Sequence, residues 1–194
     1  MPASETIDDV EMIYKFVCQG GLTYEKCISS DMWLKRVQEE NPHIVLVVLA
    51  GNSVGSNKPR ELMKQECKEF YRRLRSYLPN AIIVAAQAEM RFYAEMNVRG
   101  APVGGDYIRD RSFLNKFICK QVKTKDRMML VGGTNMDKDK YYEKDGIHMN
   151  RQGMKTYVEC IQNVIKAIHR DIEKRMECET GLLTLEKKIN ANKE

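Results

Sequence analysis

Hydrophobic and polar positions alternate along the chain in blocks that predict strands followed by helices. Segments 44–49 and 81–86 are apolar at every position, which is typical of strands covered on both faces in a parallel sheet. Segment 128–131 is also apolar and precedes a pair of glycines, so it predicts the last strand. Segment 15–18 comes before another glycine pair and predicts a short first strand.

Apolar residues at helical spacing fill the intervals between these strands. They predict helices over about 24–40, 59–78 and 107–120, and a long helix that starts at about Arg151. Segment 91–106 is rich in glycine and breaks this pattern, so it predicts a long loop. Loops of that length are more often functional than decorative.

The alternation of strands and helices predicts an α/β fold with a mainly parallel sheet and right-handed crossovers. Ligands of such folds bind beyond the carboxyl ends of the strands. Short glycine-containing turns follow three of the predicted strands, and we expect them to line one rim of the sheet: Gly20-Gly21, Gly51-Asn52 and Gly132-Gly133.

The composition agrees with one globular domain. The chain has 194 residues, of which 43% are hydrophobic and 30% charged, enough for a substantial core. We expect a poorly ordered N-terminus (1–11), an α/β domain (12–177) and a polar C-terminal tail (178–194). The net charge of +5 is spread over short clusters, which a solvated surface explains more simply than a nucleic-acid interface.

Cysteine and histidine spacing gives no sign of a metal site or a cofactor. The six cysteines form no C-x-x-C pair, and the three histidines lie far apart. The acidic N-terminus lacks the features of a signal peptide, and no apolar stretch reaches the roughly twenty residues of a membrane span. We therefore expect a cytoplasmic protein with free thiols. The oligomeric state has no sequence signal.

Candidate chemistry is concentrated in two short segments. Asp145 and His148 are three residues apart, so one loop can direct a carboxylate and an imidazole to the same point. Asn52 follows the 44–49 strand and offers a side-chain amide. An Asp-His pair with an amide donor makes up most of an acyl-transfer site. The plainer alternatives are a helix-capping Asp and an Asn that suits a turn.

These segments resemble the sequence blocks of the SGNH/GDSL hydrolase superfamily of esterases, over about residues 12–170. Segment 20–23 is similar to the second block, 50–53 to the third and 145–148 to the fifth. The resemblance implies a flavodoxin-like three-layer αβα sandwich. It also implies roles for individual residues: Asp145 and His148 as catalytic pair, Gly21 and Asn52 as oxyanion donors, and Ser53 beside them. Past the strand ends we expect further ligand contacts from Gly20, Gly51, Arg91 and Tyr93.

The chain departs from the family at the first block, Gly-Asp-Ser, which carries the nucleophile. No such block precedes Gly20, and Ser4 lies in an acidic context. Ser53 and Ser56 lie near Asn52, but a serine is inert without a base in reach. The resemblance therefore implies a truncated pseudoenzyme that lacks the first, central strand. We expect the strand at 15–18 to move beside 44–49, which gives a four-stranded sheet.

Three functions follow from this interpretation. The first is an esterase-like domain that is inactive or weakly active on small carboxylic esters. The second is a non-catalytic module that binds a small acyl or carbohydrate ligand or a protein partner. The third and least supported is a nucleic-acid-associated domain, which would require salt-dependent binding.

Overall fold

The computed structural model describes residues 3–7, 10–15, 17–54, 58–92, 105–132 and 136–191. The chain forms two compact units, Met1–Lys155 and Thr156–Glu194. The first unit contains the β-strands and the candidate site. Helix α7 (Arg151–Ala191) begins in the first unit and continues through the second.

The sheet of the first unit has three parallel strands in the order β3-β4-β5. Ile44 lies opposite Ile82 in the first pair, and Ile83 lies opposite Met128 in the second. The strands are β3 (Ile44–Val47), β4 (Ile82–Ala86) and β5 (Met128–Val131). The three predicted strands at 44–49, 81–86 and 128–131 are therefore confirmed, with β3 shorter than expected.

Burial separates the central strand from the edge strand. Four of the five residues of β4 are buried, as expected for a strand covered on both faces. In β3 only Val47 is fully buried, and Val48 directly after it is 53% exposed. The apolar run at 44–49 thus predicts the strand correctly but overstates how completely it is covered.

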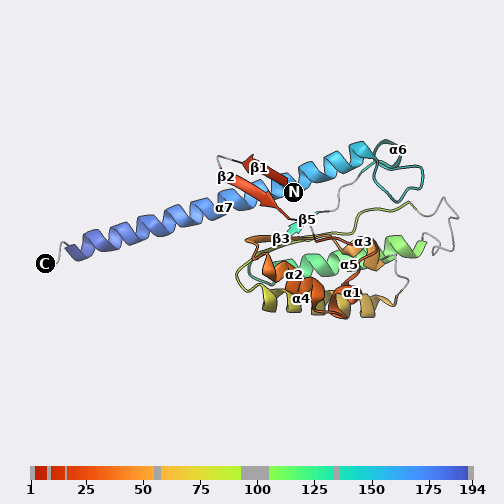
Figure 1. The fold of residues 1–194 in the computed structure, drawn as a ribbon, viewed down its shortest axis with the longest axis horizontal. Helices are drawn as coiled ribbons and strands as arrows, with labels where there is room; N and C mark the ends of the chain where they lie inside the picture. The colour runs from red at the N-terminus through yellow and green to blue at the C-terminus, as the bar shows by residue number, and fades with distance from the viewer. Residues whose placement is uncertain are drawn as a thin grey trace. The chain divides into compact units, whose positions relative to one another are not determined.

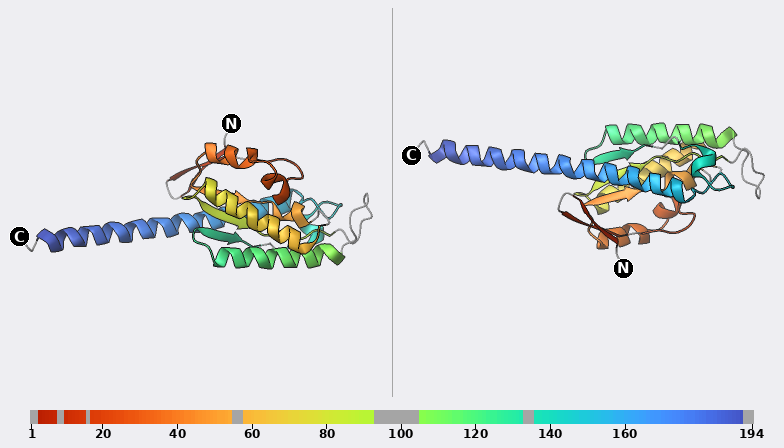
Figure 2. Two further views of the ribbon diagram at one scale, coloured as in Figure 1. Left: turned by 90° about the horizontal axis from the view of Figure 1, so that it is seen from below. Right: turned by 90° about the horizontal axis from the view of Figure 1, so that it is seen from above.

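Two long helices connect the strands and lie side by side on one face of the sheet (Figures 1 and 2). They are α4 (Arg60–Tyr77), which joins β3 to β4, and α5 (Gly105–Lys123), which joins β4 to β5. Shorter helices complete the unit: α1 (Tyr24–Ile28), α2 (Met32–Glu39), α3 (Ala50–Val54) and α6 (Lys138–Tyr141). The fold is therefore mixed α/β, as in an αβα sandwich that lacks strands.

The core lies between β4 and these helices, and aromatic rings contribute much of it. Tyr24 from α1 packs against Phe70 and Tyr71 of α4, with ring centroids 5.3 Å and 5.9 Å away. Ile83 of β4 and Leu114 of α5 have no exposed surface. Each buried side chain of this size contributes roughly 1.5–3 kcal/mol, so this cluster gives the 24–28 segment a firm attachment.

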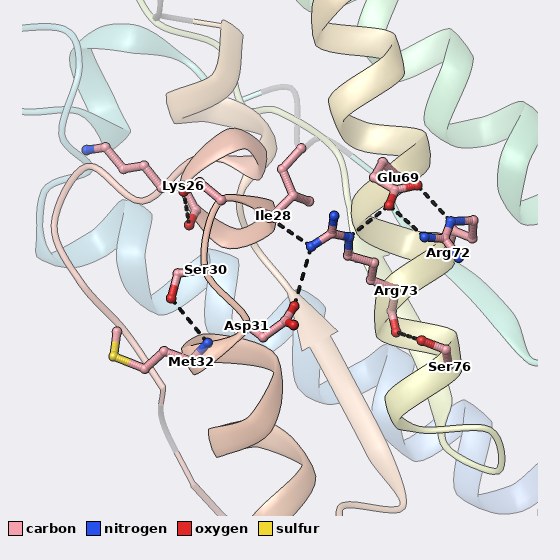
Figure 3. Close-up of polar contacts among 10 residues, drawn as sticks. Lys26, Ile28, Ser30, Asp31, Met32, Glu69, Arg72, Arg73 and Ser76 are labelled. Atoms are coloured by element: carbon pink, nitrogen blue, oxygen red, sulfur yellow. Dashed lines mark hydrogen bonds and ion pairs between the residues drawn. The ribbon is translucent and has the colours of Figure 1, made fainter.

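The single helix predicted over 24–40 is wrong, because the structure divides it into α1 and α2. Arg73 of α4 donates to the Ile28 carbonyl oxygen at 2.8 Å and to Asp31 Oδ1 at 3.4 Å (Figure 3). The Ser30 hydroxyl accepts from the Met32 backbone N–H at 3.3 Å. Serine and aspartate side chains compete with helical hydrogen bonds in this way, so the helix ends and restarts here.

The N-terminal region differs most from expectation. Strands β1 (Ala3–Ile7) and β2 (Val10–Tyr14) form an antiparallel hairpin, with Ala3 opposite Tyr14. The expected poorly ordered segment 1–11 thus contains β1 and the start of β2. Among the described residues of 15–18 none is in a strand, so the predicted fourth strand is wrong. The hairpin satisfies its backbone groups by pairing with itself, which removes the need to join the sheet.

The start of α7 agrees with the sequence. The Asn150 side chain accepts from the Gly153 N–H at 2.9 Å, which is the usual role of an N-cap asparagine. The helix continues to Ala191 and so includes residues 178–191 of the segment 178–194 that we expected to be a polar tail. No helix in the described part of the chain combines the length and apolar character needed to cross a membrane.

Candidate active site

Asp145 and His148 contact each other directly in the loop before α7. The distance between Asp145 Oδ2 and His148 Nδ1 is 2.5 Å. Asp145 Oδ1 accepts two further hydrogen bonds, from the backbone N–H groups of Ile147 at 2.8 Å and His148 at 2.9 Å. One carboxylate therefore fixes both the turn and the orientation of the imidazole ring. The histidine side chain is 76% exposed.

These hydrogen bonds stabilise the ionised form of Asp145. The backbone N–H of His148, followed by its side chain and the Ile147 N–H, lowers the pKa of Asp145 from 3.8 to about 2. At neutral pH the carboxylate can only accept hydrogen bonds. This contact with Asp145 favours the tautomer of the neutral imidazole that carries its hydrogen on Nδ1, and in that tautomer Nε2 has the lone pair of a base.

Tight backbone packing holds the 145–148 turn in place. Gly146 has a φ of +62°, and its carbonyl oxygen accepts from the Phe92 N–H at 2.7 Å. A Cβ at this glycine would lie 3.0 Å from Phe92 Cβ. At Gly153, in the first turn of α7, a Cβ would lie only 2.1 Å from the Tyr141 carbonyl oxygen. Both glycines allow approaches that a side chain would block.

Asn52 lies in α3, just beyond the end of β3, and both ends of its amide have partners. Its Nδ2 donates to the Leu22 carbonyl oxygen at 3.1 Å. Its Oδ1 accepts from an Arg91 terminal nitrogen at 2.9 Å. The amide orientation is thus set by a carbonyl on one side and a guanidinium on the other. One N–H of the Nδ2 group is not needed for the bond to Leu22.

The glycines of the 20–21 turn and of α3 differ in whether the local structure requires a glycine. Gly21 has a φ of +68°, and its carbonyl oxygen accepts from Lys26 Nζ at 2.8 Å. A Cβ at Gly51 would lie 3.2 Å from an Arg91 terminal nitrogen, so glycine admits the guanidinium here. A Cβ at Gly20 would meet nothing within 4 Å. Gly20 is therefore exposed to solvent without a structural contact that requires it.

Ser53 has a structural position. Its hydroxyl accepts from the Tyr24 backbone N–H at 3.1 Å and donates to the Leu49 carbonyl oxygen at 3.3 Å. The residue is 1% exposed. Together with the bond from Asn52 to Leu22, this hydroxyl attaches α3 to the 20–24 turn, so the segments similar to the second and third blocks lie side by side.

Arg91 and Phe92 connect the two parts of the candidate site. Arg91 contacts Asn52, and its neighbour Phe92 donates to Gly146 in the turn that carries Asp145 and His148. Two adjacent residues after β4 thus reach both motifs. Tyr93 and Ser56, the other candidates of these segments, lie outside the described residues.

Metal binding has no support in the described part of the chain, which contains no group of three His, Cys, Asp or Glu side chains able to hold an ion. The candidate site brings together one carboxylate, one imidazole, one amide and one guanidinium.

The fold of the chain is similar to that of several solved structures. The chain is similar to the family 3 carbohydrate esterase of Clostridium thermocellum, with 14% identity, a TM-score of 0.56, and 76% of this chain and 69% of that one covered. A mutant acetyl esterase with an acetate ion is 13% identical, with a TM-score of 0.62 and coverage of 78% and 70%. A family 3 carbohydrate esterase of Talaromyces cellulolyticus is 14% identical, with a TM-score of 0.60, and 78% of this chain and 70% of that one are covered.

The chain has an SGNH/GDSL hydrolase-like fold. No protein-family model and no curated protein matches the sequence, so the structural likeness carries this assignment, and at such low identity it concerns the fold. The expected fold class is confirmed, including the incomplete sheet. The SGNH/GDSL-like architecture also accounts for the location of the site, because Asn52 follows β3 and Arg91 follows β4 at the carboxyl ends of the strands.

Sequence reasoning missed several groups that hold this candidate site together. Tyr142 is buried and packs edge-on against Phe92, with ring centroids 5.1 Å apart. Burial, followed by the nearby Glu89 carboxylate, raises the pKa of Tyr142, while Arg111 and Arg91 oppose that shift. Tyr142 comes three residues before Asp145, and this proximity in the sequence could have indicated that it supports the turn. The Leu22 carbonyl and the Phe92 N–H are backbone groups, so the type of residue gives no indication of their role.

Proposed function

We propose that this chain is an SGNH hydrolase-type, esterase-like domain that keeps the acid–base pair and the amide of an ester-hydrolysing site but lacks a serine nucleophile. We expect it to be inactive or weakly active on small carboxylic esters. The observation that carries the proposal is the 2.5 Å contact between Asp145 and His148, on a turn joined through Phe92 to the segment that bears Arg91.

The proposed chemistry follows from the protonation states. Ionised Asp145 accepts the Nδ1 hydrogen of His148, and Nε2 can then take a proton from an attacking hydroxyl or water. The Asn52 amide and the Gly21 backbone N–H are the proposed donors to the oxyanion. An imidazole without a positioned nucleophile supplies only part of the rate enhancement of the complete triad.

The position of Ser53 supports the proposed lack of a nucleophile beside Asn52. Ser53 is buried, and its hydroxyl is bonded to backbone groups on two sides. A hydroxyl in that position cannot reach an ester without breaking both bonds. This supports weak activity over a complete catalytic site, and it supports the pseudoenzyme interpretation of the sequence.

The substrate class is proposed from the neighbours. Several of them are named carbohydrate esterases or acetyl esterases, so small acetyl and carbohydrate esters are the compounds to test. The proposal needs no metal and no cofactor. Five of the six cysteines are free thiols in the structure (Cys18, Cys27, Cys67, Cys119 and Cys160), which agrees with the cytoplasmic location that we propose.

Hydrolysis of p-nitrophenyl acetate tests the proposal, followed in the first seconds and at steady state. We expect no burst of p-nitrophenol and a slow release close to that of free imidazole. His148→Ala should remove any excess over background, while His43→Ala, which alters an exposed histidine beside β3, should leave it unchanged. A burst of one equivalent that His148→Ala abolishes would contradict the proposal.

A second candidate, a non-catalytic binding module, has its own supporting observation. Both ends of the Asn52 amide and the Ser53 hydroxyl already bond to groups of the chain itself. In this second function, the site binds a small acyl or carbohydrate ligand, or a protein partner, and catalyses no reaction. Thermal stabilisation by acetate or an acetylated sugar in the native protein, lost in Asn52→Ala, would favour this function. No shift with any of these compounds would count against it.

A further inference from the structure

A hollow of about 660 Å³ lies along helix α5, apart from the Asp145–His148 turn. We call it the α5 hollow. Its wall includes four cationic side chains and no acidic one: Arg111, Lys116, Lys120 and Lys123. A hollow of this size lies within the range of roughly 300–1,000 Å³ that is usual for small-ligand sites.

The lysines of the α5 hollow differ from the cations of the neighbouring helix α4 in their ion pairing. In the described part of the chain, no ion pair involves Lys116, Lys120 or Lys123. The neighbouring helix α4 is different, since four of its cations have a carboxylate partner: Arg60, Lys64, Arg72 and Arg73. The positive charge of the α5 hollow is therefore not neutralised by the chain, whereas that of α4 largely is.

The floor of the α5 hollow is held rigidly by hydrogen bonds to the backbone after β4. The Asn115 amide accepts from the Ala88 N–H at 2.8 Å and donates to the Ala88 carbonyl oxygen at 3.1 Å. Arg111 Nε donates to the same carbonyl oxygen at 2.8 Å, a bond in which its terminal nitrogens take no part. Gln87 Nε2 donates to Cys119 Sγ at 3.1 Å. A fixed floor reduces the entropy that a ligand has to lose on binding.

The arrangement of the charges indicates the class of ligand. Lys116 and Lys123 are seven residues apart, which is about 10 Å along a helix. Three ammonium groups along that length can contact several phosphates of one ligand at once, and lysine binds phosphate as a mobile point charge. No aromatic side chain lines the α5 hollow. Bases of single-stranded nucleic acids therefore have no surface to stack on.

We propose that the α5 hollow binds a small ligand that carries two or more phosphate groups. The phosphates contact Lys116, Lys120 and Lys123, and Arg111 contacts the end of the ligand nearest Ala88. This site is separate from the proposed ester chemistry, and it stands even if the chain has no esterase activity.

Calorimetric titration with inorganic tripolyphosphate at low salt tests the proposal. The native protein should show one saturable site. The variant Lys116→Gln, Lys120→Gln, Lys123→Gln should bind on the order of tenfold more weakly, with a smaller dependence on salt concentration. The matched control Lys64→Gln, Lys68→Gln, Arg72→Gln loses the same charge at helical spacing on α4 and should stay within about twofold of the native protein.

A local probe keeps the test valid if the triple variant folds poorly. Cys119 lines the α5 hollow, whereas Cys18 is exposed elsewhere. In the native protein, tripolyphosphate should slow alkylation of Cys119, detected by mass spectrometry, and leave Cys18 unaffected. Equal protection of both thiols, or none, would overturn the proposal.

The identity of the ligand is resolved by competition. Adenosine triphosphate should displace tripolyphosphate if closely spaced phosphates are what the site recognises, and a monophosphate should compete far more weakly. A single-stranded oligonucleotide that binds more tightly than tripolyphosphate, with equal losses in both triple variants, would contradict the proposal. So would the absence of saturable binding in the native protein.

Discussion

The two parts of the candidate site differ in where their polar groups are directed. The imidazole of His148 is largely exposed and is oriented by a carboxylate within its own turn. The Ser53 hydroxyl and the Asn52 amide instead bond to backbone groups of the 20–24 turn. One part is arranged as a base open to solvent, and the other joins segments of the fold.

This difference shows that motif residues can keep their positions while their hydrogen bonds serve the structure. The Asp-x-x-His turn orients its ring with its own four residues, while Phe92 and Tyr141 hold the turn in place from outside. The α3 segment depends on the 20–24 turn for its hydrogen bonds. Substitutions should therefore separate effects on stability from effects on the base.

The largest expected effect comes from Gly153→Ala, which attacks the support of the Asp145–His148 turn. The added Cβ would lie 2.1 Å from the Tyr141 carbonyl oxygen, so the backbone has to move. We expect a loss of about 3 kcal/mol in the free energy of unfolding, measured by urea denaturation. Gly20→Ala is the control, since its Cβ meets nothing, and should change the free energy by less than about 0.5 kcal/mol. Equal effects of the two substitutions would contradict this packing.

Ser53→Ala tests whether the hydroxyl is structural. It leaves the backbone N–H of buried Tyr24 without its partner, which costs roughly 1–3 kcal/mol. Urea denaturation measures the loss. Ser76→Ala removes an exposed hydroxyl bonded to the Arg73 carbonyl and should cost far less. If Ser53→Ala were neutral in stability but abolished ester hydrolysis, Ser53 would be a nucleophile and the structural interpretation would fail.

A double-mutant cycle of Asn52→Ala and Arg91→Ala measures how strongly the site residues depend on each other. The two side chains share a 2.9 Å hydrogen bond. We expect a coupling free energy of about 0.5–1 kcal/mol, since one partner is charged and both are only partly buried. Thermal or urea denaturation of the four proteins gives the value. Additive effects would show that the guanidinium does not hold the amide.

The Asp145 side chain is 35% exposed and solvent screens its interactions, so the acid dependence of stability linked to it is the smallest expected effect. Its pKa is lowered from 3.8 to about 2 in the folded chain. A lowered pKa means that the ionised group stabilises the fold above pH 4, and that this contribution is lost as the pH falls from about 4 to about 2. Asp145→Asn should flatten the stability profile in that range. The carboxyl signal of Asp145, followed by NMR, should titrate near pH 2, and titration near pH 4 would refute the hydrogen bonding.

Much of the sheet could be predicted because its signal is local. The apolar runs at 81–86 and 128–131 are too short for a typical helix and end at turn residues, which favours strands, and β4 and β5 form there. Segment 15–18 is ambiguous by the same criterion. Strand pairing depends on which partner is in reach, and the hairpin of β1 and β2 is decided by contacts that the pattern of 15–18 does not contain.

Those parts of the candidate site whose chemistry belongs to side chains could be predicted from the sequence. Asp145, His148 and Asn52 stand out by residue type and spacing, and Arg91 by its place after a strand. The burial of Ser53 could not be predicted, because it depends on the Tyr24 N–H and the Leu49 carbonyl, which are backbone groups. The split between α1 and α2 depends on Arg73, more than forty residues away.

Labelling with a fluorophosphonate probe, which reacts only with activated serines, tests the central claim most directly. The account predicts no covalent adduct on the native chain by intact mass spectrometry, although His148 is accessible. A stoichiometric adduct on any serine, lost in His148→Ala, would show that the site has a working nucleophile and would contradict the account.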